Sequence, residues 1–177
     1  MEEKTHLLDL SQDTGIIPEE ELETSPGYPS KEDLNQGPVV VIECTEEVPC
    51  DPCETVCKGG AIVVGKPITN LPRLDSEKCN GCGLCIPICP GLAIFLVDAT
   101  YSEDEAAISF PHEYLPLPKE SDEVEAVNRK GRIVCKGKVI KVRSPKRYDH
   151  TPVLTIVVPK KYLHEVRGLK SGREVIT

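Results

Sequence analysis

The spacing of four cysteines between residues 79 and 89 constrains this chain more than any other feature. Cys79, Cys82 and Cys85 form a C-x2-C-x2-C triplet, and Cys89 follows after three further residues, directly before Pro90. A triplet of this spacing wraps a short loop around a compact iron–sulfur cube and gives it three thiolates. The three-residue step turns the fourth cysteine toward a different cluster. The run therefore predicts a second set of cysteine ligands elsewhere in the chain.

An internal repeat supplies that second set. Residues 50–64 (CDPCETVCKGGAIVV) align without gaps on residues 82–96 (CGLCIPICPGLAIFL). The alignment pairs Cys50 with Cys82, Cys53 with Cys85 and Cys57 with Cys89. Each half is expected to form a ligand loop, one helical turn and a short strand, and the two halves are expected to close on each other, because a half-unit cannot bury its core alone. Glu47 occupies the position equivalent to Cys79, so Cys44 is the remaining candidate, and a three-residue insertion is the simplest interpretation.

Eight cysteines then divide into two sets of four, each with three cysteines from one half of the repeat and one from the other half. The first predicted set is Cys44, Cys50, Cys53 and Cys89, and the second is Cys57, Cys79, Cys82 and Cys85. Asn80, Gly81 and Gly83 suit a loop whose backbone N–H groups point at sulfur, since glycine adopts positive φ at little cost. Each set is expected to hold one 4Fe–4S cluster.

The composition limits the classes of function that we expect for this chain. The 177-residue chain has a net charge of −8 and a pI of about 5.1, which argues against binding nucleic acid. Residues 1–4 lack the apolar segment of a secretory signal, and no stretch approaches the roughly 18 apolar residues of a membrane span. We therefore expect a cytoplasmic chain in which clustered thiols bind metal rather than form disulfides. If the chain were held together by disulfides, its nine cysteines would also leave one thiol unpaired.

The chain divides into three parts by composition. Residues 1–37 are acidic and predict either a flexible tail or an arm that orders against a partner, residues 38–97 hold the eight cysteines, and residues 98–177 predict a small, mostly β domain. Short helices are expected at 18–22 and 30–34, strands at 38–44, within 93–111, within 129–142 and at 151–159, a linker or loop at 115–126, and a short helix at 159–168. The expected fold class is α+β.

The cysteine pattern, the Cys89–Pro90 step and the two Gly-x-Ala-Ile tails resemble a bacterial-type two-cluster ferredoxin over residues 38–97. The resemblance implies a pseudo-twofold module that transfers single electrons and has no catalytic residue. Two features depart from the family. Lys58 replaces the usual proline, and its charge should favour the reduced, more negatively charged cluster; if Cys44 is not a ligand, the first cluster would be a three-iron species.

Segments outside the module extend the resemblance. The acidic arm and residues 37–57, 110–118 and 130–167 are similar to small ferredoxin-like subunits of prokaryotic flavin-dependent dehydrogenases of amino and imino acids such as proline, hydroxyproline and sarcosine. This similarity implies FAD-containing dehydrogenase subunits as partners in a hetero-oligomeric complex. The chain would relay electrons from a flavin on one subunit to another flavin or an external acceptor.

Other interpretations remain open for several residues. The eight cysteines could hold two zinc ions, although zinc has no use for the triplet, and the chain could be a free, diffusible ferredoxin. Cys135, in an alternating β run, is expected to act as a small apolar side chain. The four histidines His6, His112, His150 and His164 have no partner at metal-ligand spacing. A basic run is either a solvated β face or a docking site for an acidic partner: Lys136, Lys138, Lys141, Arg143, Lys146 and Arg147.

Overall fold

The computed structural model describes residues 15–170, and most of its regular structure is strand. The strands are β1 (Val39–Ile42), β2 (Ile62–Val63), β3 (Arg73–Leu74), β4 (Ile94–Asp98), β5 (Glu105–Pro111), β6 (Glu123–Asn128), β7 (Ile133–Arg143), β8 (Val153–Pro159) and β9 (Val166–Leu169). The helices are short: α2 (Glu19–Glu23), α3 (Lys31–Leu34), α4 (Pro52–Val56) and the 3-10 turns η1 (Ser76–Lys78), η2 (Lys146–Tyr148) and η3 (Lys160–Tyr162). No helix in the described part has the length and apolar character of a membrane span.

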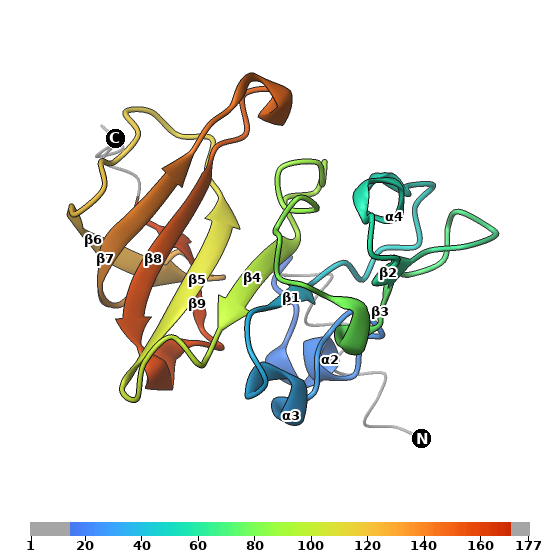
Figure 1. Ribbon diagram of the computed structural model, residues 1–177, viewed down its shortest axis with the longest axis horizontal. Coiled ribbons are helices and arrows are strands. Elements are labelled where there is room, and N and C mark those ends of the chain that lie inside the picture. Colours follow the sequence, from blue (N-terminus) through green and yellow to red (C-terminus); the bar gives the residue numbers. More distant parts are fainter. Residues whose placement is uncertain (1–14, 171–177) are drawn as a thin grey trace.

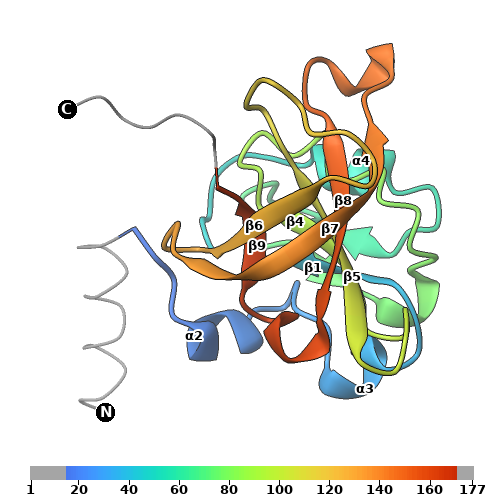
Figure 2. The same cartoon turned by 90° about the vertical axis from the view of Figure 1, so that its left-hand side faces the viewer.

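One antiparallel sheet runs through the molecule. Its seven strands are ordered β1-β4-β5-β8-β7-β6-β9, and β2 and β3 form a separate pair. The last strand, β9, comes back to contact β5, so the far end of the sheet curls on itself (Figures 1 and 2). The expected boundary at residues 97 and 98 lies inside β4, which pairs with β1 on one side and with β5 on the other. The cysteine-rich module and the β-rich part therefore share a sheet.

The β1–β4 hairpin separates two apolar cores. Val39 and Val41 face a core built from the curled sheet, whereas Val40 and Ile42 face a core that contains buried cysteines. Alternate side chains of a strand point to opposite faces, so a strand buried on both faces is apolar at every position, as the run VVVI is. This continuous run explains why the two parts pack as one body.

The sequence repeat is also a structural repeat. In the β1–β4 pair, Ile42 faces Ile94, and in the β3–β2 pair, Leu74 faces Ile62. Leu74 follows Ile42 by 32 residues and Ile94 follows Ile62 by the same number, which is the offset of the cysteine repeat. The two halves thus contribute one strand each to both pairs, as a pseudo-twofold arrangement requires.

The N-terminal segment folds against its own chain from residue 15 onward. Leu22 of α2 and Leu34 of α3 are buried, and Ser30 begins α3 with a capping box to Asp33. Between the helices, the carbonyl of Gly27 accepts a hydrogen bond from Ile42 N (3.0 Å), and that of Pro26 accepts one from Leu74 N (2.9 Å). The segment therefore bridges the two halves of the repeat, a role that the expectation of a tail or a partner-bound arm did not include. Residues 1–14 of that arm lie outside the described residues.

Gly27 offers a test of this bridge. A Cβ atom at Gly27 would lie 2.8 Å from Ile42 Cβ and 3.0 Å from the carbonyl oxygen of Pro72. Gly27→Ala is therefore expected to cost about 1–3 kcal/mol, which corresponds to a thermal midpoint lower by about 2–4 °C per kcal/mol. Gly91→Ala is the control, because a Cβ there meets no atom within 4 Å. Thermal loss of the visible absorbance of both variants measures the difference, and equal midpoints would contradict the proposed packing.

Two expectations for the C-terminal part need correction. The segment 115–126, expected as a linker or loop, has no helix or strand as far as residue 122, but its last four residues belong to β6, which pairs with both β7 and β9. The segment 159–168, expected as a helix, forms only the turn η3 before continuing into strand β9. Its Val166 is fully buried in the core of the curled sheet, and this tertiary contact outweighs the local helix signals.

Candidate metal centre

Four cysteines of the first predicted set line one pocket. Cys44 follows the end of β1, Cys50 and Cys53 lie around the start of α4, and Cys89 comes from the second half of the repeat. Burial, and to a smaller extent the charges of Cys89 and Cys50, raise the pKa of the Cys53 thiol to about 11. Burial likewise raises the pKa of Cys44, with added repulsion from Cys89 and Cys50. The second half thus contributes a thiol to the group of the first half.

The remaining four cysteines form the reciprocal group. Burial, and to a smaller extent the charges of Cys79, Cys82 and Cys57, raise the pKa of the Cys85 thiol to about 12. Cys57 belongs to the first half of the repeat, whereas the other three belong to the second. Cys85 is buried and Cys82 is exposed, so this group has one ligand candidate at the surface. The structure therefore places Cys57 near the three cysteines of the second half, and the assignment of the two ligand sets stays a prediction.

The donor chemistry fits a metal cluster. Thiols with raised pKa values stay protonated at neutral pH without metal, and metal binding releases those protons. Within residues 15–170, no group of three or more His, Cys, Asp or Glu side chains is close enough to hold a single metal ion.

Matched hydrogen bonds hold the two exchanged cysteines. Ala61 N donates to Cys57 Sγ at 3.2 Å, and Ala93 N donates to Cys89 Sγ at 3.5 Å. Gly60 and Leu92, which precede the two donors, both have positive φ (64° and 51°) and donate to the carbonyls of the same cysteines. A leucine in this conformation is uncommon, and its presence shows that the turn itself is required at both sites. Such N–H groups aimed at sulfur are one means by which a protein tunes cluster potential.

The loop of the second triplet is built on glycine, as expected. Gly81 and Gly83 have φ values of 66° and 67°, and the side chain of Asn80 accepts a hydrogen bond from Cys82 N at 3.2 Å. A Cβ atom at Gly81 would lie 2.9 Å from the carbonyl oxygen of Pro38, so this position tolerates no side chain. The loop therefore packs directly against the residue that precedes β1.

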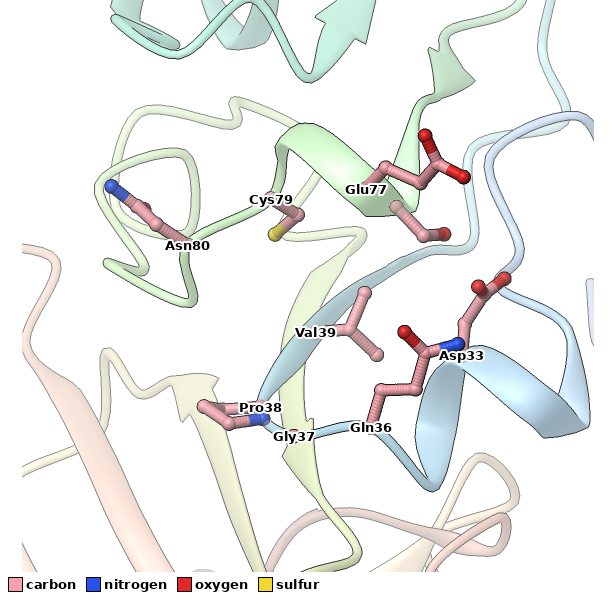
Figure 3. Close-up of a pocket in the computed structure, with 9 residues that line it drawn as sticks. Asp33, Gln36, Gly37, Pro38, Val39, Glu77, Cys79 and Asn80 are labelled. Atoms are coloured by element: carbon pink, nitrogen blue, oxygen red, sulfur yellow. The ribbon is translucent and has the colours of Figure 1, made fainter.

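A pocket of about 310 Å³ separates this loop from the N-terminal segment (Figure 3). Asp33 and Gln36 line it from the α3 side, and Glu77, Cys79 and Asn80 line it from the loop side, with Val39 between them. Its charged lining is acidic, which is unfavourable for a further thiolate or an anion. The pocket adds no ligand to the centre.

The position of Cys44 differs from the interpretation as an insertion. Ile42 and Leu74 are equivalent, and the distance along the chain from Ile42 to Cys50 is the same eight residues as from Leu74 to Cys82. The first half therefore contains no net insertion. The segments from Ile42 to Cys50 and from Leu74 to Cys82 are equally long, but Cys44 lies three residues nearer the start of its segment than Cys79 does. In the second half, the turn η1 fills the residues directly before Cys79.

The structure contains a buried ionic cluster next to Cys44 that the sequence did not predict. The Glu43 carboxylate binds Arg167 Nε at 2.6 Å and Arg129 Nε at 2.9 Å, and the three side chains are almost entirely or largely buried. Burial alone would raise the pKa of Glu43, but the hydrogen bonds and charges of the two arginines outweigh it and hold the pKa below its usual value. Arg167 also stacks on the Phe95 ring at 5.1 Å. No spacing rule links residues 43, 129 and 167, so only the fold could bring them together.

The other predicted residues lie apart from the two groups. Cys135 is partly buried on β7 and packs against the core of the curled sheet. His112 stacks edge-on against Tyr114, and Nδ1 of His164 lies 3.4 Å from the Tyr28 hydroxyl. Lys58, next to Cys57, is exposed. His6 lies outside the described residues.

A family model described as a 4Fe-4S binding domain matches residues 72–95, which contain β3, the triplet and Cys89. The chain is 44% identical over 45 residues to one subunit of the Na(+)-translocating ferredoxin:NAD(+) oxidoreductase complex of Acetobacterium woodii, a match that covers 25% of this chain and 13% of that protein. It is 47% identical over 47 residues to one subunit of the ion-translocating oxidoreductase complex of Methanosarcina acetivorans, covering 27% and 17%.

A third relative is the ferredoxin-type protein NapF of Escherichia coli K12, with 37% identity over 51 residues, covering 28% of this chain and 31% of NapF. The chain thus spans less than a third of the length of each relative. No solved structure matches it. The chain contains a 4Fe–4S binding domain, which confirms the predicted iron–sulfur chemistry and its electron-transfer role. The resemblance to amino-acid and imino-acid dehydrogenase subunits finds no support in these relatives.

Proposed function

We propose that the chain is an electron-transfer subunit that relays single electrons through two 4Fe–4S clusters within a multi-subunit oxidoreductase. The observation that supports the proposal is the pocket in which Cys89, from the second half of the repeat, lies beside three cysteines of the first half. Cys44, Cys50, Cys53 and Cys89 would hold one cluster, and Cys57, Cys79, Cys82 and Cys85 would hold the other. The clusters supply one-electron chemistry when bound. The protein's own contribution is to fix eight thiolates, exclude water from Cys53 and Cys85, and direct N–H groups at sulfur.

Two short paths connect the clusters in this arrangement. Cys57 follows α4, whose Cys53 belongs to the other set, and Cys89 lies four residues after Cys85. Cys53, Cys85 and Ile86 share one buried core with strands of both halves. An electron passing between the two clusters would cross this buried core.

Metal analysis of the anaerobically purified chain tests the cluster content. We expect a brown protein with about eight iron atoms and an equal amount of labile sulfide, since each cube holds four of each. A colourless protein with about two zinc atoms would support paired zinc sites instead. An iron content near seven would identify the first cluster as a three-iron species and remove Cys44 from the ligands.

A narrower proposal concerns the partners. The resemblance of the flanking segments to dehydrogenase subunits suggests an FAD-containing chain that delivers electrons from an amino or imino acid. Native purification followed by mass spectrometry of the associated chains tests this. An associated flavoprotein that reduces the clusters with proline, hydroxyproline or sarcosine would support the narrower proposal. Clusters that are complete in an isolated monomer would favour a free, diffusible ferredoxin.

A further inference from the structure

A groove lies beside the exposed ligand candidate of the second group. It has a volume of about 270 Å³ and runs between the loop of the triplet and the outer face of the β-rich sheet. Cys82 and Gly83 line it from the loop, Tyr101 lines it from the turn after β4, and Lys141 and Arg143 line it from β7. Cys82 is exposed and the Tyr101 side chain is 45% exposed, so the groove opens directly onto a thiol that would bind a cluster.

Positive charge gathers at this groove although the chain as a whole is acidic. Lys141 and Arg143 lie in its wall, and Lys146 and Arg147 follow in the adjoining turn η2. Arg143 and Arg147 both stack on the ring of Tyr148, at 5.5 and 5.3 Å, which keeps their guanidinium groups at this edge. Within the described residues none of these four cations takes part in an ion pair. Among the groove residues Asp98 carries the opposing charge, and its carboxylate accepts from Thr100.

Tyr148 fixes this basic edge to the centre. Its side chain is 4% exposed and packs in the same core as Cys85 and Ile86. The turn η2 is therefore held against the triplet region rather than projecting freely into solvent. The buried Tyr148 side chain therefore fixes where the positive charges lie relative to the groove.

The mouth of the first group has the opposite charge. Glu46 lines the pocket of Cys44 and Cys50. Asp51, the N-cap residue of α4, follows Cys50 directly. The two ends of the predicted relay thus differ in sign, so an acidic surface is repelled from the first group and attracted to the second.

We propose that the groove beside Cys82 is the docking site for an acidic surface of a redox partner protein, which exchanges electrons with the second cluster. This inference rests on the proposed function. Tyr and Arg are the residue types that dominate binding energy at protein interfaces, and Tyr101 and Arg143 provide both here. Complementary charge raises the rate of encounter, by about 10- to 1000-fold where it focuses on a cleft.

Two cobalt oxidants of opposite charge test the proposal in the reduced, cluster-containing protein. Each takes one electron from a cluster and is reduced from Co(III) to Co(II), and stopped-flow absorbance gives the rate. For Lys141→Glu/Lys146→Glu we expect oxidation by the anion tris(oxalato)cobaltate(III) to slow at least about tenfold at low salt, with the difference vanishing at high salt. Oxidation by the cation hexaamminecobalt(III) is expected to stay equal or rise. Lys31→Glu/Lys130→Glu makes the same change in net charge away from the groove and should leave the anion's rate close to that of the unchanged protein.

Poly-L-glutamate serves as the acidic polypeptide in a second arm. It should slow oxidation by the cobaltate in the unchanged protein and have no such effect in Lys141→Glu/Lys146→Glu. The proposal would be overturned if the cobaltate oxidation depended on the groove lysines but polyglutamate did not slow it. It would also be overturned if both pairs of substitutions slowed this oxidation equally. A dimer in sedimentation that dissociates in Lys141→Glu/Lys146→Glu would instead assign the groove to a second copy of this chain. If the reduced protein shows no cluster signals, the proposed function itself fails; normal cluster signals with an unaffected anion rate reject only the docking site.

Discussion

Replacing Cys89 with serine is expected to remove the cluster of Cys44, Cys50 and Cys53 and to leave the other cluster in place. Serine keeps the size of the side chain but removes the thiolate that cluster iron requires. We expect the iron content to fall from about eight to about four atoms and one of two paramagnetic signals of the reduced protein to disappear. Electron paramagnetic resonance and iron analysis of the same sample measure both effects.

Cys57→Ser is the reciprocal experiment and should remove the other signal. The expectation follows from the matched environments of the two residues, since each Sγ accepts an N–H from the alanine four positions later. If the two sets did not exchange members, Cys89→Ser would instead affect the cluster of Cys79, Cys82 and Cys85. Two unchanged signals in either variant would therefore contradict the ligand assignment.

Cys135→Ser is the matched control for both variants. Cys135 is the ninth cysteine, lies on β7 and packs against the core of the curled sheet. Its replacement should leave the iron content and both signals unchanged. A loss of iron in this variant would mean that simple removal of a thiol destabilises the protein, and the result for Cys89 would then lose its meaning.

The thiol groups could be predicted from the sequence because local spacing determines them. A C-x2-C-x2-C loop places three thiols together whatever surrounds it, and the repeat locates the two that cross over. The same offset of 32 residues relates the two strand pairs, since Leu74 and Ile94 follow Ile42 and Ile62 by that number. What the repeat could not reveal was that Cys44 lies earlier within a segment of unchanged length, because that conclusion needs the strand register.

Long-range contacts decided the features that the sequence did not reveal. The segment at 159–168 carries a proline start and a glycine stop, yet Val166 is buried between strands and the chain extends there as β9. Pro26 and Gly27 looked like part of an acidic tail, but their carbonyls meet the N–H groups of two equivalent strand residues. In the first case the burial of an apolar residue outweighed local propensity, and in the second case backbone hydrogen bonds to distant strands fixed the course of the chain.

Glu43→Gln is expected to be the most destabilising change that keeps all nine cysteines. The carboxylate lies between two buried arginines, and glutamine has nearly its shape but no charge. Breaking a buried ion pair by removing one partner costs about 3–5 kcal/mol, because the remaining charge has no compensation. Two guanidinium groups, of Arg129 and Arg167, would be left facing each other. For a chain of this size the thermal midpoint should fall by roughly 6–20 °C.

The exposed pair Lys170–Glu125 gives the control. Its two atoms lie 3.1 Å apart, but both side chains are about half exposed, so Glu125→Gln should cost at most about 1 kcal/mol. A double variant, Glu43→Gln/Arg167→Met, should recover part of the loss because it removes one of the two unpaired charges. The coupling energy of this cycle measures the ion pair, and strictly additive effects would argue against it.

The pH dependence of stability distinguishes the contribution of the Glu43 charge from that of the packing of its side chain. Its pKa in the folded protein is lowered from the ordinary value of 4.5, since the two arginines outweigh the effect of burial. The stability that it contributes is therefore complete above the unfolded pKa and is lost as the pH falls through the lower, folded value. We expect the difference in midpoint between the unchanged protein and Glu43→Gln to be constant near neutral pH and to shrink in acid. A difference that persists unchanged well below pH 4.5 would show that packing, and not the charge between Arg129 and Arg167, joins the β-rich part to the residue before Cys44.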